Sequence, residues 1–372
     1  MYTKTTRKTR NDKIREKRRK SRKGVSHSKA SDTLRLNVCK ALNANSLFAN
    51  FAGFRDFTLF AFFVWLSRDF RVGKMPKHMK WKNLPSPTYS HPQANTYLDS
   101  RVQSHYMYTL EASSMFFHPY KTPEIFAAMH SAGLDSVEFW METPEFWMAG
   151  ARIDELLEEK KRYPHLFPLA MHAPIFDLNP CSFNPKVAAL SADCTIDCIE
   201  MLEALGGGIV TIHPGKRTAK RPVTYLDKER FHQYLGRLSE VSGKNVIIAL
   251  ENMPPAVNAH ITTAPEMREV LDEYSWLSFT FDYAHAQAAG EPFSFIEQCS
   301  DRMVNIHASL GRSGAMHSPL AGTAEGDTLK AVLKDIGYTG RITYEFEDLN
   351  FGELSLLDRT EILAEETRWY RG

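Results

Sequence analysis

Residues 245–282 read NVIIALENMPPAVNAHITTAPEMREVLDEYSWLSFTFD, and this stretch contains the pattern from which the fold follows. The apolar run Asn245–Glu251 is followed by a helix start at Thr263-Ala264-Pro265-Glu266 and then by a second apolar run, Ser278–Asp282. A proline in the first turn and an acid three residues after a threonine are typical of a helix N-terminus. The order strand, helix, strand predicts a βαβ unit with parallel strands.

The same unit recurs from Met107 to the C-terminus. Amphipathic helical stretches separate eight short runs of β-branched or aromatic residues, which we predict to be strands. The runs are Tyr108–Ser113, Ser136–Trp140, Phe167–His172, Gly208–His213, Asn245–Glu251, Ser278–Asp282, Met303–His307 and Arg341–Phe346. A barrel of eight such units takes about 250 residues. We therefore predict an α/β fold, a (β/α)8 TIM barrel over residues 107–372. A doubly wound sheet is disfavoured because the chain has no glycine-rich phosphate loop.

Six predicted strands carry, as their last or next-to-last residue, a side chain that can bind a metal ion. These side chains are His172, His213, Glu251, Asp282, His307 and Glu345. The carboxyl ends of barrel strands point at one central region, where the active sites of this fold lie. His172 alone would be explained by a hydrogen bond at the rim, and Glu251 alone by an ion pair. Burying all six is costly unless they are paired or coordinate metal, so we predict a metal-dependent enzyme.

Charge is divided unevenly along the chain. Residues 1–106 carry 23 Lys and Arg against 6 Asp and Glu, a formal charge of +17. The whole chain has 46 and 44, so residues 107–372 carry 23 and 38, a charge of −15. Binding to nucleic acid depends largely on cations that neutralise phosphates. The acidic barrel therefore argues against DNA as the substrate, and a small molecule is the expected partner.

The first 106 residues lack the alternation of strands and helices, and we expect a basic N-terminal extension of low order. Basic residues crowd positions 4–23, where disorder is the first expectation and an arm for nucleic acid or a membrane surface is the alternative. The apolar stretch Phe57–Leu66 is too short to span a bilayer. Our hypothesis is that Met107 is the native start. Peptides from upstream residues in the endogenous protein would refute it.

The five cysteines are odd in number and show no pairing pattern. This favours a reducing compartment, so we expect a cytoplasmic protein without a membrane span. Cys194 and Cys198 have helical spacing and no second pair beside them, and we interpret them as buried small side chains rather than zinc ligands. Assembly into a homo-oligomer stays open.

The strand-end motifs resemble those of a known family. In chain order they are His172-Ala173-Pro174, His213-Pro214-Gly215, Glu251-Asn252, Asp282-Tyr283-Ala284-His285, His307 and Glu345. This series resembles the xylose isomerase-like TIM-barrel superfamily over the whole of residues 107–372. The string from Phe281 to Ala286 is its most specific part. The superfamily includes sugar and sugar-phosphate isomerases and epimerases, and also nucleases of the endonuclease IV type.

The isomerase and epimerase branch implies one divalent ion. Its ligands here would be Glu251, Asp282, His307 and Glu345. Manganese, magnesium or cobalt suits such an oxygen-rich set with one imidazole. The resemblance then implies that Glu251 and Glu345 move a proton through an enediolate, while Glu138 and His285 contact substrate hydroxyls. Our first prediction is therefore an isomerase or epimerase of a sugar or sugar phosphate.

The endonuclease IV branch is the alternative, and it implies a cluster of three zinc ions. The additional ligands would be His172, His213, His285 and His317. One position departs from that pattern, because Ala315 stands where the family has an aspartate, which removes a ligand of the third ion. With the acidic charge, this ranks a DNA nuclease second. A two-zinc hydrolase of a small phosphoester stays open, since His172, His213 and Glu251 could hold a second ion.

Basic residues follow the fourth predicted strand on the expected catalytic face. Lys216 and Arg217, then Lys220 and Arg221, come directly after His213-Pro214-Gly215. A substrate phosphate would attract them, and a solvated basic loop is the structural alternative. We predict Lys216 and Arg217 as substrate-binding residues.

Overall fold

A computed structural model describes residues 108–372 except 244, 257 and 313–314. The basic run at residues 4–23, the apolar stretch at 57–66 and the hypothesis of a start at Met107 lie outside the described residues. The low order of the extension and the domain boundary at residue 107 therefore stay predictions.

Eight parallel strands form one sheet that closes into a barrel. They are β1 (Thr109–Ala112), β2 (Glu138–Trp140), β3 (Ala170–His172), β4 (Gly208–Ile212), β5 (Val246–Glu251), β6 (Ser278–Asp282), β7 (Met303–His307) and β10 (Arg341–Tyr344). From β2 to β7 each strand pairs with the next, and β10 pairs with both β7 and β1. A parallel bridge between Ser113 and Glu138 joins the first strand to the second. The predicted (β/α)8 TIM barrel is confirmed.

All eight predicted strands are present, although most are shorter than predicted. Ser278–Asp282 and Met303–His307 match at both ends, and the others lose one to three residues at an end. An antiparallel hairpin that follows β7 in the chain was not predicted from the sequence. Its strands are β8 (Leu310–Arg312) and β9 (Ala315–Ser318). This hairpin matters because His317 lies on β9.

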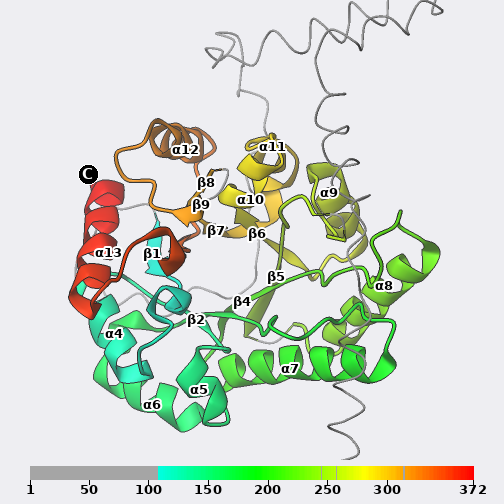
Figure 1. Ribbon diagram of the computed structural model, residues 1–372, viewed down its shortest axis with the longest axis horizontal. Coiled ribbons are helices and arrows are strands. Elements are labelled where there is room, and N and C mark those ends of the chain that lie inside the picture. The colour runs from blue at the N-terminus through cyan, green and yellow to red at the C-terminus, as the bar shows by residue number, and fades with distance from the viewer. Residues whose placement is uncertain (1–107, 244, 257, 313–314) are drawn as a thin grey trace, which may run out of the picture. The chain divides into compact units, whose positions relative to one another are not determined.

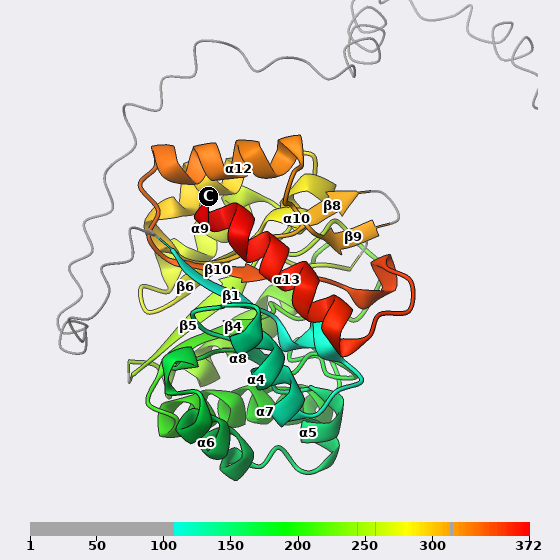
Figure 2. The ribbon, with the colours of Figure 1, turned by 90° about the vertical axis from the view of Figure 1, so that its left-hand side faces the viewer.

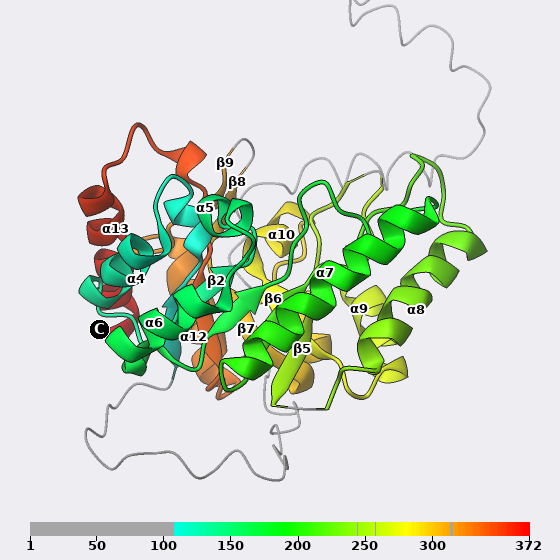
Figure 3. The same ribbon diagram turned by 90° about the horizontal axis from the view of Figure 1, so that it is seen from below.

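Helices cover the outside of the barrel (Figure 1). The longer ones are α4 (Thr122–Ser131), α6 (Ile153–Arg162), α7 (Pro185–Ala204), α8 (Tyr225–Ser239), α9 (Ala264–Glu273), α12 (Ala324–Asp335) and α13 (Leu356–Arg371). Shorter ones are α5 (Pro144–Met148), α10 (Tyr283–Ala288), α11 (Ser294–Cys299) and 3-10 helices at Ser114–Phe117, Pro164–Leu166, Ser300–Arg302 and Asp348–Asn350. The last helix, α13, packs beside α4 (Figure 2), and α7 lies beside α8 (Figure 3). Within the described residues, no helix combines the length and apolarity that crossing a membrane requires.

A glutamate side chain caps the backbone at the predicted start of α9 and likewise at the start of α4. The Lys121 N–H donates to the Glu124 carboxylate at 2.9 Å before α4, and the Thr263 N–H donates to the Glu266 carboxylate at 3.1 Å before α9. Each bond satisfies a donor that the first helical turn leaves unpaired. Behind α4, Gly133 adopts a φ of +75°, which glycine reaches without steric cost.

Alternate residues of each strand face two different surroundings. Outward side chains are apolar and pack under the helices, as Phe139 does against Phe146 of α5 with ring centroids 5.0 Å apart. Inward side chains are largely polar and meet across the barrel. Thr211 Oγ1 of β4, for example, lies 3.0 Å from Thr280 Oγ1 of β6. Because side chains alternate with a period of two, the polar strand-end residues share this inward side.

Candidate metal centre

Eight titratable side chains gather at the carboxyl end of the barrel. They are His172, Glu251, Asp282 and His307 at strand ends, His213 and Glu345 just behind β4 and β10, His285 in α10 and His317 in β9. Seven are buried, and His213, the most open, exposes 18% of its side chain. The structure therefore brings together every residue that either branch of the family implied as a metal ligand.

Four atoms of this cluster face one another without a hydrogen-bond partner among the described residues. They are Glu251 Oε1, Asp282 Oδ2, His307 Nδ1 and Glu345 Oε2. His307 Nδ1 lies 3.1 Å from Glu345 Oε2 and 3.8 Å from Asp282 Oδ2. A buried polar atom without a partner costs about 1–3 kcal/mol, and more when it is charged. Three carboxylate oxygens and one imidazole nitrogen therefore fit a divalent cation that all four would share.

A second ligand group is built on the other oxygen of Glu251. Its Oε2 lies 3.0 Å from His213 Nε2 and 3.4 Å from His172 Nε2. His172 Nδ1 lies 2.9 Å from the Ala173 carbonyl oxygen, which can only accept. Nδ1 must therefore carry the hydrogen, and Nε2 is left to bind an ion. The Trp140 indole stacks on His172 with ring centroids 3.8 Å apart and fixes the plane of the imidazole.

Asp282, His285 and His317 form a third ligand group. His285 Nδ1 lies 2.8 Å from the Asn252 carbonyl oxygen, so it donates there and leaves Nε2 for a ligand. His317 Nδ1 lies 3.0 Å from the Ser309 hydroxyl. Glu251 belongs to the first and second groups, and Asp282 to the first and third. The cluster therefore offers ligands for more than one ion around two shared carboxylates.

The pKa values of the three carboxylates in the cluster are shifted in different directions. Burial opposes the charge of Glu251, but His213 and His307 lower its pKa well below the ordinary value. His307 also lowers the pKa of Glu345 against the effect of burial. Burial raises the pKa of Asp282 well above its ordinary value, and the carboxylates of Glu345 and Glu251 add to this rise. Carboxylates this close repel one another, and a metal ion between them would remove that repulsion.

The pKa is lowered for some imidazoles of the cluster and raised for others. Burial lowers the pKa of His213 and of His317. Burial also opposes the charge of His285 and His307, but nearby carboxylates outweigh it. They raise the pKa of His285 to about 9 and that of His307 well above its ordinary value. Since protons and metal ions compete for ring nitrogens, metal binding here is expected to weaken as the pH falls.

Glu138 does not lie at the surface of the site, where we predicted that it contacts substrate hydroxyls. Its side chain is fully buried, and its Oε2 lies 3.0 Å from His307 Nε2 and 3.0 Å from Asn305 Nδ2. In the pairing of β2 with β3 it stands level with Ala170, one layer below His172. Glu138 therefore contacts a candidate ligand from behind and exposes no surface to a substrate.

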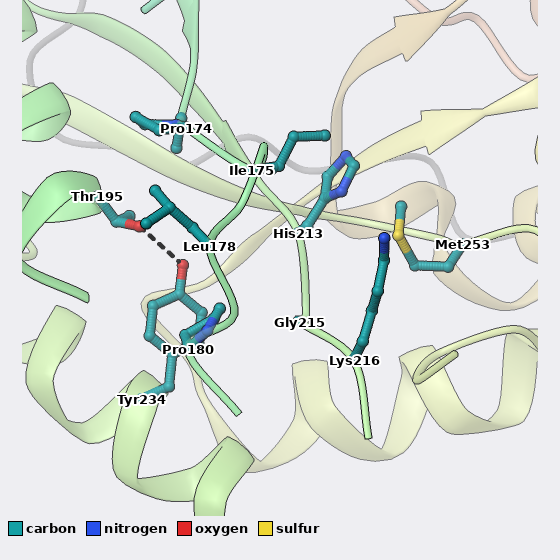
Figure 4. A pocket seen from close by; sticks show the side chains of 11 residues that line it. Pro174, Ile175, Leu178, Pro180, Thr195, His213, Gly215, Lys216, Tyr234 and Met253 are labelled. Atoms are coloured by element: carbon teal, nitrogen blue, oxygen red, sulfur yellow. Dashed lines mark hydrogen bonds between the residues drawn. The ribbon is translucent and has the colours of Figure 1, made fainter. Parts of the chain in front are cut away.

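The basic residues predicted to bind substrate lie in the loop behind β4. Lys216 lines a small pocket beside His213, together with apolar residues that include Ile175 and Met253. Figure 4 shows the Lys216 amino group ending beside Met253, on the side of the pocket that carries the His213 ring. Asn179 fixes the Lys216 backbone, accepting from its N–H at 2.9 Å and donating to its carbonyl at 2.8 Å. Arg217 does not line this pocket.

Asn252 is a positioning residue that the sequence analysis quoted only as part of a motif. Its side-chain oxygen accepts from the Asp282 N–H at 2.8 Å, and its side-chain nitrogen donates to the Asp282 carbonyl at 2.9 Å. Its own carbonyl accepts from His285, as described above. Asn252 thus holds two candidate ligands, and its position next to Glu251 was the only signal in the sequence.

The chain matches the model of the xylose isomerase-like TIM barrel over residues 126–372, and it belongs to this family. The resemblance seen in the strand-end motifs is confirmed. An uncharacterized protein of Methanocaldococcus jannaschii is 34% identical over 247 residues, which are 65% of this chain and 90% of that protein. A probable endonuclease 4 of Akkermansia muciniphila is 25% identical over 198 residues, 50% of this chain and 68% of the relative.

Solved structures with this fold carry names from both branches. A D-tagatose 3-epimerase-like protein has a TM-score of 0.56 at 25% identity, covering 70% of this chain and 97% of its own. An L-ribulose 3-epimerase has a TM-score of 0.54 at 16% identity, with coverages of 70% and 92%. Endonuclease IV of Thermus thermophilus has a TM-score of 0.50 at 17% identity, with coverages of 70% and 98%. The last two share the fold alone, so the reaction must be argued from the site.

Proposed function

We propose that this chain is a metal-dependent hydrolase that cleaves a small phosphoester with more than one divalent ion in its site. One observation carries the proposal: His172 and His213 both face Oε2 of Glu251, while Oε1 of the same carboxylate belongs to another ligand group. The group of Glu251, Asp282, His307 and Glu345 already offers four ligands to one ion, so a single ion gives these two imidazoles no role as ligands. Sites that hold two ions a few ångströms apart are typical of phosphatases and nucleases.

Ions bound by these groups would neutralise phosphoryl oxygens and make a water molecule a better nucleophile. The other tasks fall to residues of the chain itself. Lys216 would pair with a phosphate oxygen beside His213, and Asn179 orients the backbone from which that lysine extends. Trp140, nearly buried, covers one face of His172 and keeps water away from it.

A small substrate is favoured over duplex DNA. The barrel carries a formal charge of −15 over residues 107–372, which repels a polyphosphate backbone. Ala315 stands at the position where a nuclease of the endonuclease IV type has a further metal-binding aspartate. A single phosphoester group needs only the local cations of the site, so the overall charge is less of an obstacle to it.

The isomerase or epimerase activity expected from the sequence is the second candidate. The group of Glu251, Asp282, His307 and Glu345, which fits one manganese, magnesium or cobalt ion, favours it, as does the 25% identity to a D-tagatose 3-epimerase-like protein. In this reaction Glu251 and Glu345 would move the substrate proton. We rank it second because two imidazoles already engage the Glu251 Oε2 that would accept a proton.

An activity panel separates the two candidates. The full chain, loaded with zinc or manganese, would be assayed on bis(4-nitrophenyl) phosphate, on a set of ketoses and on a duplex with an abasic site. We expect release of nitrophenol and no ketose conversion. Ketose conversion without phosphodiester cleavage would overturn the proposal. The Glu251→Gln variant should be inactive on every substrate, because this carboxylate belongs to two ligand groups.

A further inference from the structure

His307 has a different kind of hydrogen-bond partner from His172 and His285. His172 and His285 each turn one ring nitrogen to a backbone carbonyl. His307 instead turns its Nε2 to a carboxylate, that of Glu138, at 3.0 Å. Both side chains are fully buried inside the barrel. A buried carboxylate paired with an imidazole is a strong hydrogen-bond acceptor, because little water screens its charge.

The contacts of Glu138 determine which nitrogen of His307 carries the hydrogen. A carboxylate oxygen accepts, so the hydrogen of a neutral His307 ring lies on Nε2. Nδ1, which lies 3.1 Å from Glu345 Oε2 and 3.6 Å from Glu251 Oε1, is then the nitrogen with the lone pair. That is the atom a cation in the first ligand group requires.

We propose that Glu138 is a positioning residue that fixes the tautomer and ring orientation of His307 for metal binding. The inference rests on the proposed metal site but on neither candidate reaction, because both use His307. It replaces the predicted contact of Glu138 with substrate.

The barrel interior holds Glu138 in this orientation. Asn305 Nδ2 donates to Glu138 Oε2 at 3.0 Å, and the Asn305 side-chain oxygen accepts from the Ile306 N–H at 2.9 Å. The second bond fixes which end of the amide faces Glu138. The Thr343 hydroxyl lies 2.9 Å from the same Asn305 oxygen and 2.8 Å from Glu111 Oε1, and its one hydrogen can be donated to only one of them. Glu138 is therefore held by groups that are themselves hydrogen-bonded.

Glu111 provides a matched control. It is also a fully buried carboxylate on the inward side of a strand. Its partners are Arg341 and the Thr343 hydroxyl, at 2.8 Å from the latter, and not His307. Replacement of Glu111 by Gln therefore also removes the charge of a buried carboxylate in the barrel interior, but of one that does not contact a candidate ligand.

Metal titration tests the proposal. Manganese would be titrated by calorimetry into metal-free wild-type chain, Glu138→Gln and Glu111→Gln. We expect the Kd of Glu138→Gln to rise by about 10- to 100-fold, as for other outer partners of metal-bound histidine, and that of Glu111→Gln to stay near the wild-type value. Unchanged affinity in Glu138→Gln, or equal losses in both variants, would overturn the inference. Absence of metal binding by the wild-type chain would instead contradict the proposed function.

A second measurement needs no variant and so does not depend on whether Glu138→Gln folds. In the zinc-loaded wild-type chain with ¹⁵N-labelled histidine, NMR distinguishes the protonated nitrogen of each ring from the metal-bound one. We expect His307 to carry its proton on Nε2 and the ion on Nδ1. The reverse assignment would overturn the inference even if Glu138→Gln weakened binding.

Discussion

The outward and inward sides of the barrel strands are built from different residues although they alternate along the same chain. On β6, Phe281 faces outward and packs against Phe295 of α11, with ring centroids 6.1 Å apart. The next residue, Asp282, faces inward among three histidines and two glutamates. The outward side gains free energy from apolar burial. The inward side contains buried charge, which is costly unless it is paired or shared with a cation.

This difference suggests that the two sides serve stability and chemistry separately. Substitutions on the outward side should lower the free energy of unfolding and leave the site of the folded protein intact. Substitutions on the inward side should remove ion binding or turnover and change the stability of the metal-free chain less. The experiments below test whether stability and chemistry are separated in this way.

The largest expected effect on stability comes from Phe281→Ala. This side chain is fully buried and contacts Phe279, Tyr283 and Phe295, so removing the ring leaves a cavity under the helices. Urea unfolding of the metal-free chain should show a loss of about 3–5 kcal/mol. The exposed Leu357→Ala should change stability by less than about 0.5 kcal/mol. Equal losses in the two variants would contradict the assigned packing.

A buried carboxylate outside the barrel interior should make stability depend on pH. Burial raises the pKa of Glu366 on α13 to about 7, although it accepts backbone N–H groups of Leu320 and Ala321. Because the folded-state pKa lies above the ordinary 4.5, the stabilisation is complete below about pH 4.5 and lost as the pH rises through 7. The loss should be on the order of 3 kcal/mol.

Unfolding with a chelator present, measured from pH 4.5 to 8, checks this dependence. Glu366→Gln should remove the decline between pH 4.5 and about 6.5, since an amide does not ionise, while the raised pKa of His285 and of His307 leaves a decline at higher pH in both proteins. Glu365→Gln, one residue earlier and exposed, should keep the whole decline. An unchanged decline below pH 6.5 in Glu366→Gln would assign it to another group.

Metal ions should stabilise the chain through the inward side alone. Manganese or zinc at a free concentration of about 100 times the wild-type Kd should raise the free energy of unfolding by about 2.7 kcal/mol for each ion site that it fills, because it binds only the native state. Thermal unfolding with and without a chelator measures this gain. Phe281→Ala should gain as much as the wild-type chain while starting from a lower melting temperature. Glu345→Gln, which removes a charged ligand, should gain less.

The smallest effect is expected at the rim of the site. Lys216→Ala should raise the KM for a phosphoester about tenfold, since a hydrogen bond to a charged group contributes about 1.5 kcal/mol. Lys220→Ala, in the same loop and also exposed, should leave KM unchanged. Steady-state kinetics of both variants measures the two KM values. A similar rise in both would indicate a general effect of positive charge rather than a contact by Lys216.

Strand ends were predictable because apolar runs of β-branched residues stop where a histidine or an acid appears, as at Met171-His172 and Leu250-Glu251. The depth at which each of these side chains lies within the barrel could not be predicted from the sequence. Glu138 shares the inward side with the candidate ligands, but the register of β2 against β3 puts it one layer lower. Staggering between strands sets that layer, and it depends on pairing that local periodicity does not contain.

His317 illustrates the other limit. The resemblance to the family pointed to this residue, whereas no strand was predicted around it, because β9 is short and, among the strands that the structure describes, pairs only with β8. Its backbone has a φ of +58°, a conformation rare for residues with a side chain. The hairpin brings this ring to the rings and carboxylates of the site through tertiary contacts, and a local sequence pattern does not predict those.

Counting bound ions tests the central claim most directly, which is that His172 and His213 build an additional ion site on Glu251. Native mass spectrometry of the zinc-loaded chain would be compared with that of the double variant His172→Ala/His213→Ala. We predict more than one zinc ion in the wild-type chain and one fewer in the variant. A single ion in both proteins would contradict the account and favour the one-ion epimerase.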